Sequence, residues 1–236
     1  MKKLFLLVLL GILPFGINAQ GFVGAWETYF SSDKDVKYRS VVIFSDNYQV
    51  ITTYEAESGK FISTNGGTWK LEGDTMTEMV EFDTVTPERV GTEISFKVHI
   101  NDSEMGIVGD DRIFERIDSG KPGELQGAWL MSGRVRDGKE QLRDVTGPRK
   151  TMKLLSGTRF QWIAYHTESK RFIGAGGGTY TTIDGKYTEN IEFFSKDDSK
   201  AGISLVFDYN FIDGVWHHEG FSSKGDAMHE IWSVRE

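Results

Sequence analysis

The chain of 236 residues contains no cysteine, and this absence removes several classes of protein. Disulfide scaffolds, cysteine–zinc modules, iron–sulfur proteins and thiol enzymes all need a sulfur atom that this chain lacks. Proline is also scarce, with 4 residues against 27 glycines, while aromatic residues make up 13%. This composition favours strands joined by tight turns over long helices.

Basic residues are fewer than acidic ones, with 27 Lys and Arg against 35 Asp and Glu, which gives a formal net charge of −8. Nucleic-acid binding depends on cations that neutralise phosphates, so we expect no DNA or RNA partner. The 39% of hydrophobic residues is typical of a folded globular protein and too high for a disordered chain.

Long apolar runs are confined to the N-terminus, which has the pattern of a secretory signal peptide. Lys2 and Lys3 precede an apolar stretch over residues 4–13, and a small residue, Ala19, ends a typical cleavage site. We therefore expect a signal peptide over residues 1–19 and export to the periplasm or the medium. A retained N-terminal anchor is the alternative. No later apolar run is long enough to span a membrane.

The rest of the chain contains an internal repeat. The motif Gly24-Ala25-Trp26 recurs as Gly127-Ala128-Trp129, and a shift of 111 residues matches a longer set of identical residues. The members of this set in the first copy are Tyr54, Glu57, Ser58, Phe61, Ile62, Gly66, Gly67, Thr68, Thr77, Glu78, Glu81, Phe82, Gly91 and Phe96. We predict one domain over residues 20–118, a Gly/Pro linker over 119–123 and a second domain over 124–236.

Within each copy the apolar residues alternate with a period of two, which indicates strands. Phe160, Trp162 and Ala164 are expected on one face of a strand, and the sequence Asp184-Gly185 suits a tight hairpin turn. The alternation places a further set on one face of the next strand: Tyr187, Glu189, Ile191 and Phe193. We predict an all-β protein of two tandem antiparallel barrels of about eight strands each, with a two-sheet sandwich as the alternative.

Four motifs of the chain are distinctive: the opening Gly-x-Trp, the segment from Gly176 to Tyr180, the strand from Tyr187 to Phe194, and Trp216-His217-His218. Together they resemble secreted bacterial lipocalin-like domains. The resemblance implies a calycin-type barrel with a ligand cavity. It also implies a setting in polysaccharide degradation, and it leaves the reaction open.

The second copy is rich in side chains that can bind or ionise, and we expect the site there. The predicted catalytic residues are His218, Tyr187 and Tyr180. The predicted substrate-binding residues are Arg159, Arg171, Trp162, Tyr165, Glu189, Trp216 and His217. At the matched positions the first copy has Met76 for Tyr187 and Trp69 for Tyr180. This difference predicts that the first barrel is structural or binds weakly.

Neighbouring residues of a strand point to opposite sides, so only one of His217 and His218 can face the cavity. We predict that Trp216 and His218 point inward and His217 outward, with the reverse register as the alternative. A histidine near neutral pH can take or give a proton, and so can a tyrosine beside a cation. The same rule places Glu189 and Glu192 on opposite faces, which argues against a glycosidase carboxylate pair.

A basic segment opens the second copy, containing Arg134, Arg136, Lys139, Arg143, Arg149, Lys150, Lys153 and Arg159. Arginine pairs well with carboxylate or sulfate, so an anionic sugar is one interpretation, and a solvated loop is the other. His166, His217, His218 and His229 show no spaced ligand motif, so we expect no metal and no cofactor.

Two functions remain open at this point. The first is an exported lyase or dehydratase that eliminates a substituent from acidic, uronate-containing oligosaccharides. The second is a binding protein without a reaction, in which aromatic residues stack on an oligosaccharide or another polar small molecule.

Overall fold

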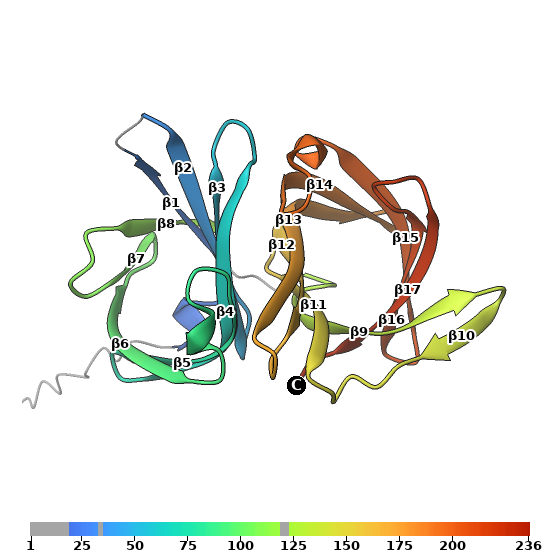
Figure 1. Cartoon of the computed structure of the whole chain (residues 1–236), viewed down its shortest axis with the longest axis horizontal. Coiled ribbons are helices and arrows are strands. Elements are labelled where there is room, and N and C mark those ends of the chain that lie inside the picture. Colours follow the sequence, from blue (N-terminus) through green and yellow to red (C-terminus); the bar gives the residue numbers. More distant parts are fainter. Residues whose placement is uncertain (1–18, 33–34, 119–122) are drawn as a thin grey trace, which may run out of the picture.

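The computed structural model describes residues 19–32, 35–118 and 123–236 as two antiparallel β-barrels that lie side by side (Figure 1). Residues 1–18 of the expected signal peptide and 119–122 of the expected linker lie outside the described residues. No helix within the described ranges is long and apolar enough to cross a bilayer.

Eight strands in sequence order close the first barrel. They are β1 (Gly24–Ser31), β2 (Lys37–Phe44), β3 (Tyr48–Glu55), β4 (Phe61–Glu72), β5 (Thr75–Asp83), β6 (Glu93–Ile100), β7 (Glu104–Ile107) and β8 (Ile113–Asp118). Two short 3₁₀ helices accompany them, η1 (Ala19–Gly21) and η2 (Pro87–Arg89). Pairing of β1 with β8 removes the free sheet edges.

The second barrel repeats this order and closes where β17 pairs with β9. Its strands are β9 (Gly127–Arg136), β11 (Arg149–Leu155), β12 (Arg159–His166), β13 (Arg171–Ile183), β14 (Lys186–Phe194), β15 (Ser204–Ile212), β16 (Val215–Phe221) and β17 (Ala227–Val234). The added strand β10 (Lys139–Leu142) pairs with β9 as a hairpin that projects from the barrel, and η3 (Asp198–Lys200) follows β14. The predicted pair of barrels is therefore confirmed, and the sandwich alternative is wrong.

Equivalent residues hold the two barrels in the same local geometry. Gly24 and Gly127 both have a φ of 128°, and the indoles of Trp26 and Trp129 each donate to a backbone oxygen four residues earlier at 2.9 Å. The tight turns follow the sequence as well, since Asp184 and Gly185 both have positive φ between paired strands.

A β-bulge recurs at the glycine pair of each copy. A Cβ on Gly67 would lie 1.9 Å from the Met79 carbonyl oxygen, and one on Gly178 would lie 1.9 Å from that of Asn190. This backbone approach explains why glycine stands at both positions. The bulge also corrects one prediction: Phe193 does not share the inward face with Ile191, because the extra residue Glu192 reverses the alternation.

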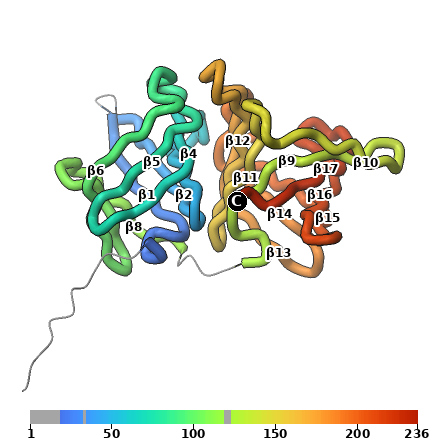
Figure 2. The backbone as a smooth tube through the Cα atoms, turned by 90° about the horizontal axis from the view of Figure 1, so that it is seen from below, coloured from blue at the N-terminus to red at the C-terminus, as the bar shows by residue number. Residues whose placement is uncertain are grey.

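Three apolar clusters stabilise the molecule. One fills the first barrel around Trp26 and Trp69, and another fills the second barrel around Trp129 and Trp216. The third lies between the barrels, where outward residues of β1 to β5 meet outward residues of β9 and β11 to β14. The C-terminal end also lies between the barrels (Figure 2), where Tyr48 donates to the Glu236 carbonyl at 2.9 Å.

Candidate functional site

The second barrel encloses a cavity of about 370 Å³. Its wall includes the inward residues Trp162 of β12 and His218 of β16, while the ring of Trp216 is fully buried in the barrel core beside His218. The predicted register is thus confirmed. His217 points outward, where its Nδ1 lies 3.0 Å from Nε2 of His229.

A buried ion pair crosses the inner part of the cavity. Nζ of Lys153 lies 2.8 Å from a carboxylate oxygen of Glu189, and both side chains are about 5% exposed. The ammonium also lies about 5 Å from the ring centres of Tyr187, Trp216 and Trp232. These cation–π contacts and the ion pair together offset the cost of removing Lys153 from water.

His218 is a fully buried titratable side chain of the cavity wall whose ring has no hydrogen bond to the described residues. Its ring is 1% exposed, and neither nitrogen has a hydrogen-bond partner among the described residues. The Glu230 carboxylate lies 3.6 Å from Nδ1, beyond good hydrogen-bonding distance. Burial, and then the positive charge of Lys153, lower the pKa of His218, which keeps the imidazole neutral at pH 7.

Further donors around Lys153 are also unpaired. The Tyr187 hydroxyl and the indole nitrogens of Trp216 and Trp232 are buried without a partner among the described residues. Burial, and then the charge of Glu189, raise the pKa of Tyr187 well above its usual range, so its hydroxyl stays protonated. Buried polar groups are nearly always satisfied in native proteins, so a cluster of donors without a protein partner is unusual.

Three arginines from β9, the following loop and β11 line the cavity: Arg134, Arg143 and Arg149. Burial, and then the charges of Arg149 and Arg134, lower the pKa of Arg143 from its ordinary value. Arg134 is 3.7 Å from Glu230, a weak and half-exposed pair. This group of guanidinium ions, which we call the arginine rim, is poorly neutralised by the protein.

The lining as a whole carries more positive than negative charge. Its charged members are Arg134, Arg143, Arg149, Lys153 and Lys196 against Glu189 and Glu230. Because the rest of the protein is acidic, this excess is local. It favours an anionic group on whatever enters the cavity.

Three of the predicted site residues line the cavity, namely His218, Trp162 and Glu189. Tyr187 packs behind the cavity wall, with its ring centre 5.5 Å from that of His218. Tyr180 contacts Tyr187 at 5.6 Å, and its hydroxyl donates to the Ser156 carbonyl at 2.6 Å. Trp69, the equivalent residue of the first barrel, donates to the Ser45 carbonyl in the same way. The bond of Tyr180 is therefore a structural feature that both barrels share.

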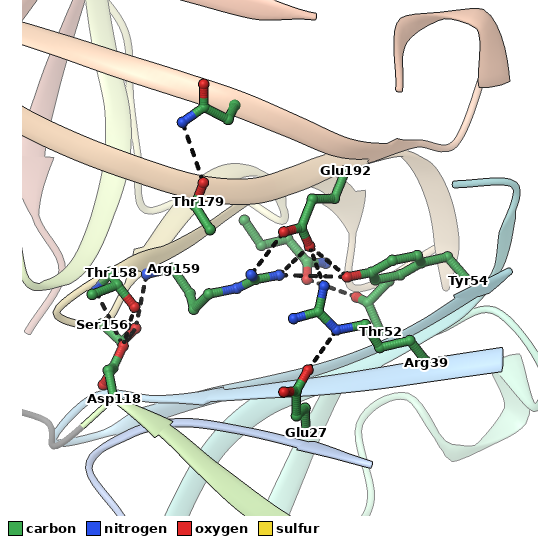
Figure 3. A network of polar contacts seen from close by, with 12 residues as sticks. Glu27, Arg39, Thr52, Tyr54, Asp118, Ser156, Thr158, Arg159, Thr179 and Glu192 are labelled. Carbon is green, nitrogen blue, oxygen red and sulfur yellow. Dashed lines mark hydrogen bonds and ion pairs between the residues drawn. The ribbon is translucent and has the colours of Figure 1, made fainter. Parts of the chain in front are cut away.

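The structure places the other predicted binding residues outside the cavity. Arg159 lies between the barrels, where it pairs with Glu192 beside Arg39 and Tyr54 (Figure 3). Tyr165 also faces the first barrel and donates to Glu81. Glu189 and Glu192 do point to opposite sides of β14, as predicted.

Arg171 is exposed at the start of β13 and does not line the cavity.

The sequence reasoning missed two residues of the inner cavity. Lys153 belongs to the basic segment, but it also shares strand parity with Leu155, which packs in the barrel core. That parity is the signal that could have found it. Trp232 lines the cavity from β17 and is matched by Phe114 in the first barrel.

The first barrel lacks this polar set. In the shared strand register, Val42 stands in place of Lys153, Met76 in place of Tyr187, and Ile107 in place of His218. Its interior leaves only about 80 Å³, and the apolar lining includes one carboxyl group, Glu78, at the position of Glu189. Among the described residues, the second barrel therefore has the larger and more highly charged interior of the two.

Neither the comparison with protein-family models nor the search of curated proteins finds a match to this chain. The two closed eight-stranded barrels are consistent with a lipocalin-like fold. Among the residues that the structure describes, no group of three or more metal-ligating side chains is placed to hold an ion.

Proposed function

We propose that the second barrel binds an acidic sugar or oligosaccharide, with its carboxylate at the arginine rim and its body in the cavity. The observation that carries this proposal is the excess of cationic over anionic side chains in the lining. Aromatic rings on the wall, Trp162 and Trp232, suit stacking on a sugar ring, and the unpaired nitrogens of two lining residues, His218 and Trp232, suit its hydroxyl groups. In this proposal the protein is exported and serves polysaccharide degradation.

Calorimetric titration tests the binding. We expect uronate oligosaccharides to bind at least about tenfold more tightly than their methyl esters, since a charge-assisted hydrogen bond contributes about 1.5–3 kcal/mol. Arg143→Gln should remove most of this preference. Arg171→Gln is the matched control, because it removes the same charge from an exposed position of the same barrel. Equal binding of acid and ester, or equal losses in both variants, contradicts the proposal.

A second candidate function, elimination from the bound uronate, is supported by the unpaired and neutral His218. The imidazole would take the proton from the carbon next to the carboxylate, while the carbon–oxygen bond to the departing sugar breaks and a double bond forms. The imidazolium would then return the proton to the departing oxygen, so that His218 ends neutral. The arginine rim would stabilise the extra negative charge on the carboxylate in the transition state.

Elimination produces a conjugated double bond that absorbs in the ultraviolet, which allows a direct assay. We expect His218→Gln to lower turnover by about 10²–10⁴-fold while binding persists, as for other lost acid–base groups. His217→Gln is the matched control, because this neighbouring histidine points out of the barrel. If the acidic ligand binds and no double bond forms, the protein is a carrier and the elimination proposal fails.

A further inference from the structure

The contacts between the two barrels are repeated with the partners exchanged. Tyr54 of the first barrel donates to Glu192 of the second at 2.6 Å. Tyr165, the repeat counterpart of Tyr54, donates to Glu81, the counterpart of Glu192. Each pair is therefore the image of the other under the shift of 111 residues.

The aromatic contacts follow the same rule. The ring of Tyr54 lies 5.2 Å from that of Phe193, and the ring of Tyr165 lies 4.8 Å from that of Phe82, the counterpart of Phe193. Phe61 stacks on Phe172, which is its own counterpart, with ring centres 5.8 Å apart and an angle of 3° between the ring planes. A residue meets its own counterpart only at a two-fold axis, so the interface has the isologous arrangement of a symmetric homodimer.

A cation stands beside each glutamate, but the pairing is exchanged only in part. Arg39 lies 2.9 Å from Glu192, whereas its counterpart Lys150 donates to the Val145 and Thr146 carbonyls and Arg235 pairs with Glu81 at 2.8 Å. A second barrel placed in the position of the first would thus present Tyr165, Lys150 and Phe172 where Tyr54, Arg39 and Phe61 now lie. The contacts of the tyrosine and the phenylalanine would survive with little change.

Gln161 is one of the buried polar groups that break the symmetry. Gln161 accepts a hydrogen bond from Thr52 at 2.6 Å and donates one to Thr64 at 3.1 Å. The counterparts of these threonines are Ile163 and Ala175, which offer the amide no partner. The counterpart of Gln161 in the first barrel is the apolar Val50.

We propose that the outward face formed by β2–β5 in the first barrel and by β11–β14 in the second, here called the pairing face, recognises a second copy of itself. The reciprocal contacts supply the recognition. Gln161 directs the second barrel to the first, because pairing of two second barrels leaves both Gln161 amides buried and unsatisfied. The chain has the architecture of a homodimer whose subunits are joined and have since diverged.

The test uses the whole protein with a protease site introduced within residues 119–122. After cleavage, both barrels remain in solution, and native mass spectrometry distinguishes the mixed pair from the two homodimers by mass. We expect the mixed pair to dominate, homodimers of the first barrel to be the next species, and homodimers of the second barrel to be the rarest.

Gln161→Val in the cleaved protein should raise the proportion of second-barrel homodimers about tenfold or more, since it removes two unsatisfied amides per pair. Gln141→Val is the matched control, because Gln141 is exposed on β10, away from the pairing face. If neither homodimer forms, or if the two variants give the same proportions, the pairing face does not recognise itself and the proposal is overturned.

Discussion

At the scale of single residues, the two barrels differ in how they accommodate a buried carboxyl group. Both carry an inward carboxyl group at the same position, Glu189 in the second barrel and Glu78 in the first. Lys153 pairs with Glu189, whereas the first barrel has Val42 in place of that lysine. Burial therefore raises the pKa of Glu78 to about 7, although the charge of Arg89 opposes the shift.

This carboxyl group should make stability depend on pH. Between the ordinary pKa of 4.5 and about 7, the folded protein holds a proton that the unfolded chain has lost, so stability falls as pH rises through this range. Glu78→Gln removes the effect and should stabilise the protein by up to about 3 kcal/mol above pH 7, with little gain near pH 4. Urea unfolding at a series of pH values measures this difference.

The control for that experiment is Glu72→Gln, an exposed carboxylate at the end of β4. It should leave the pH dependence as it is in the unmodified protein. If the Glu78→Gln variant has an unchanged pH profile of stability, burial does not raise the pKa of Glu78.

At the scale of elements, the bulged hairpins β4–β5 and β13–β14 decide which side chains enter each barrel. The bulge turns Glu192 and Phe193 outward, so that one strand supplies both the cavity and the contact with the other barrel. Strand alternation predicted the direction of Glu189 correctly but predicted the wrong direction for Phe193, four residues later. The failure has a local cause, because an inserted residue reverses every later side chain of the strand.

Gly178→Ala tests the bulge. The new Cβ would lie 1.9 Å from the Asn190 carbonyl oxygen, so the hairpin must move, and we expect a loss of at least about 3 kcal/mol of stability. Gly147→Ala is the control, since that position has open space and no positive φ. Thermal unfolding of the two variants measures the difference, and similar midpoints would show that the close approach is relieved easily.

At the scale of the whole molecule, the barrels are coupled by a buried apolar cluster and by ion pairs around Glu192 and Glu81. Glu192 joins Arg39 of the first barrel to Arg159 of the second (Figure 3). These arginines have side chains that are 17% and 7% exposed, and Arg39 has a second carboxylate partner, Glu27, at 2.6 Å.

Glu192→Ala should uncouple the barrels in part. It leaves Arg159 in a half-buried interface without its carboxylate, while Arg39 keeps its ion pair with Glu27 at 2.6 Å. We expect a loss of about 2 kcal/mol, below the range for fully buried pairs because Glu192 is partly exposed. Calorimetry should show the single unfolding transition broaden or divide into two. Asp208→Ala breaks the exposed pair with Lys186 and should cost less than about 1 kcal/mol. Equal effects of the two substitutions would contradict the coupling role.

The sequence by itself determined the repeat, the all-β class and that Trp216 and His218 share one face of their strand. These properties depend on chain-local physics, namely a period of two along each strand and glycine at turns with positive φ. Only the tertiary structure decided that Arg159 and Tyr165 serve the contact between barrels, because alternation separates inside from outside but does not say what covers the outside. It also decided that Lys153 meets Glu189, since residues 36 positions apart are brought together only when the barrel closes.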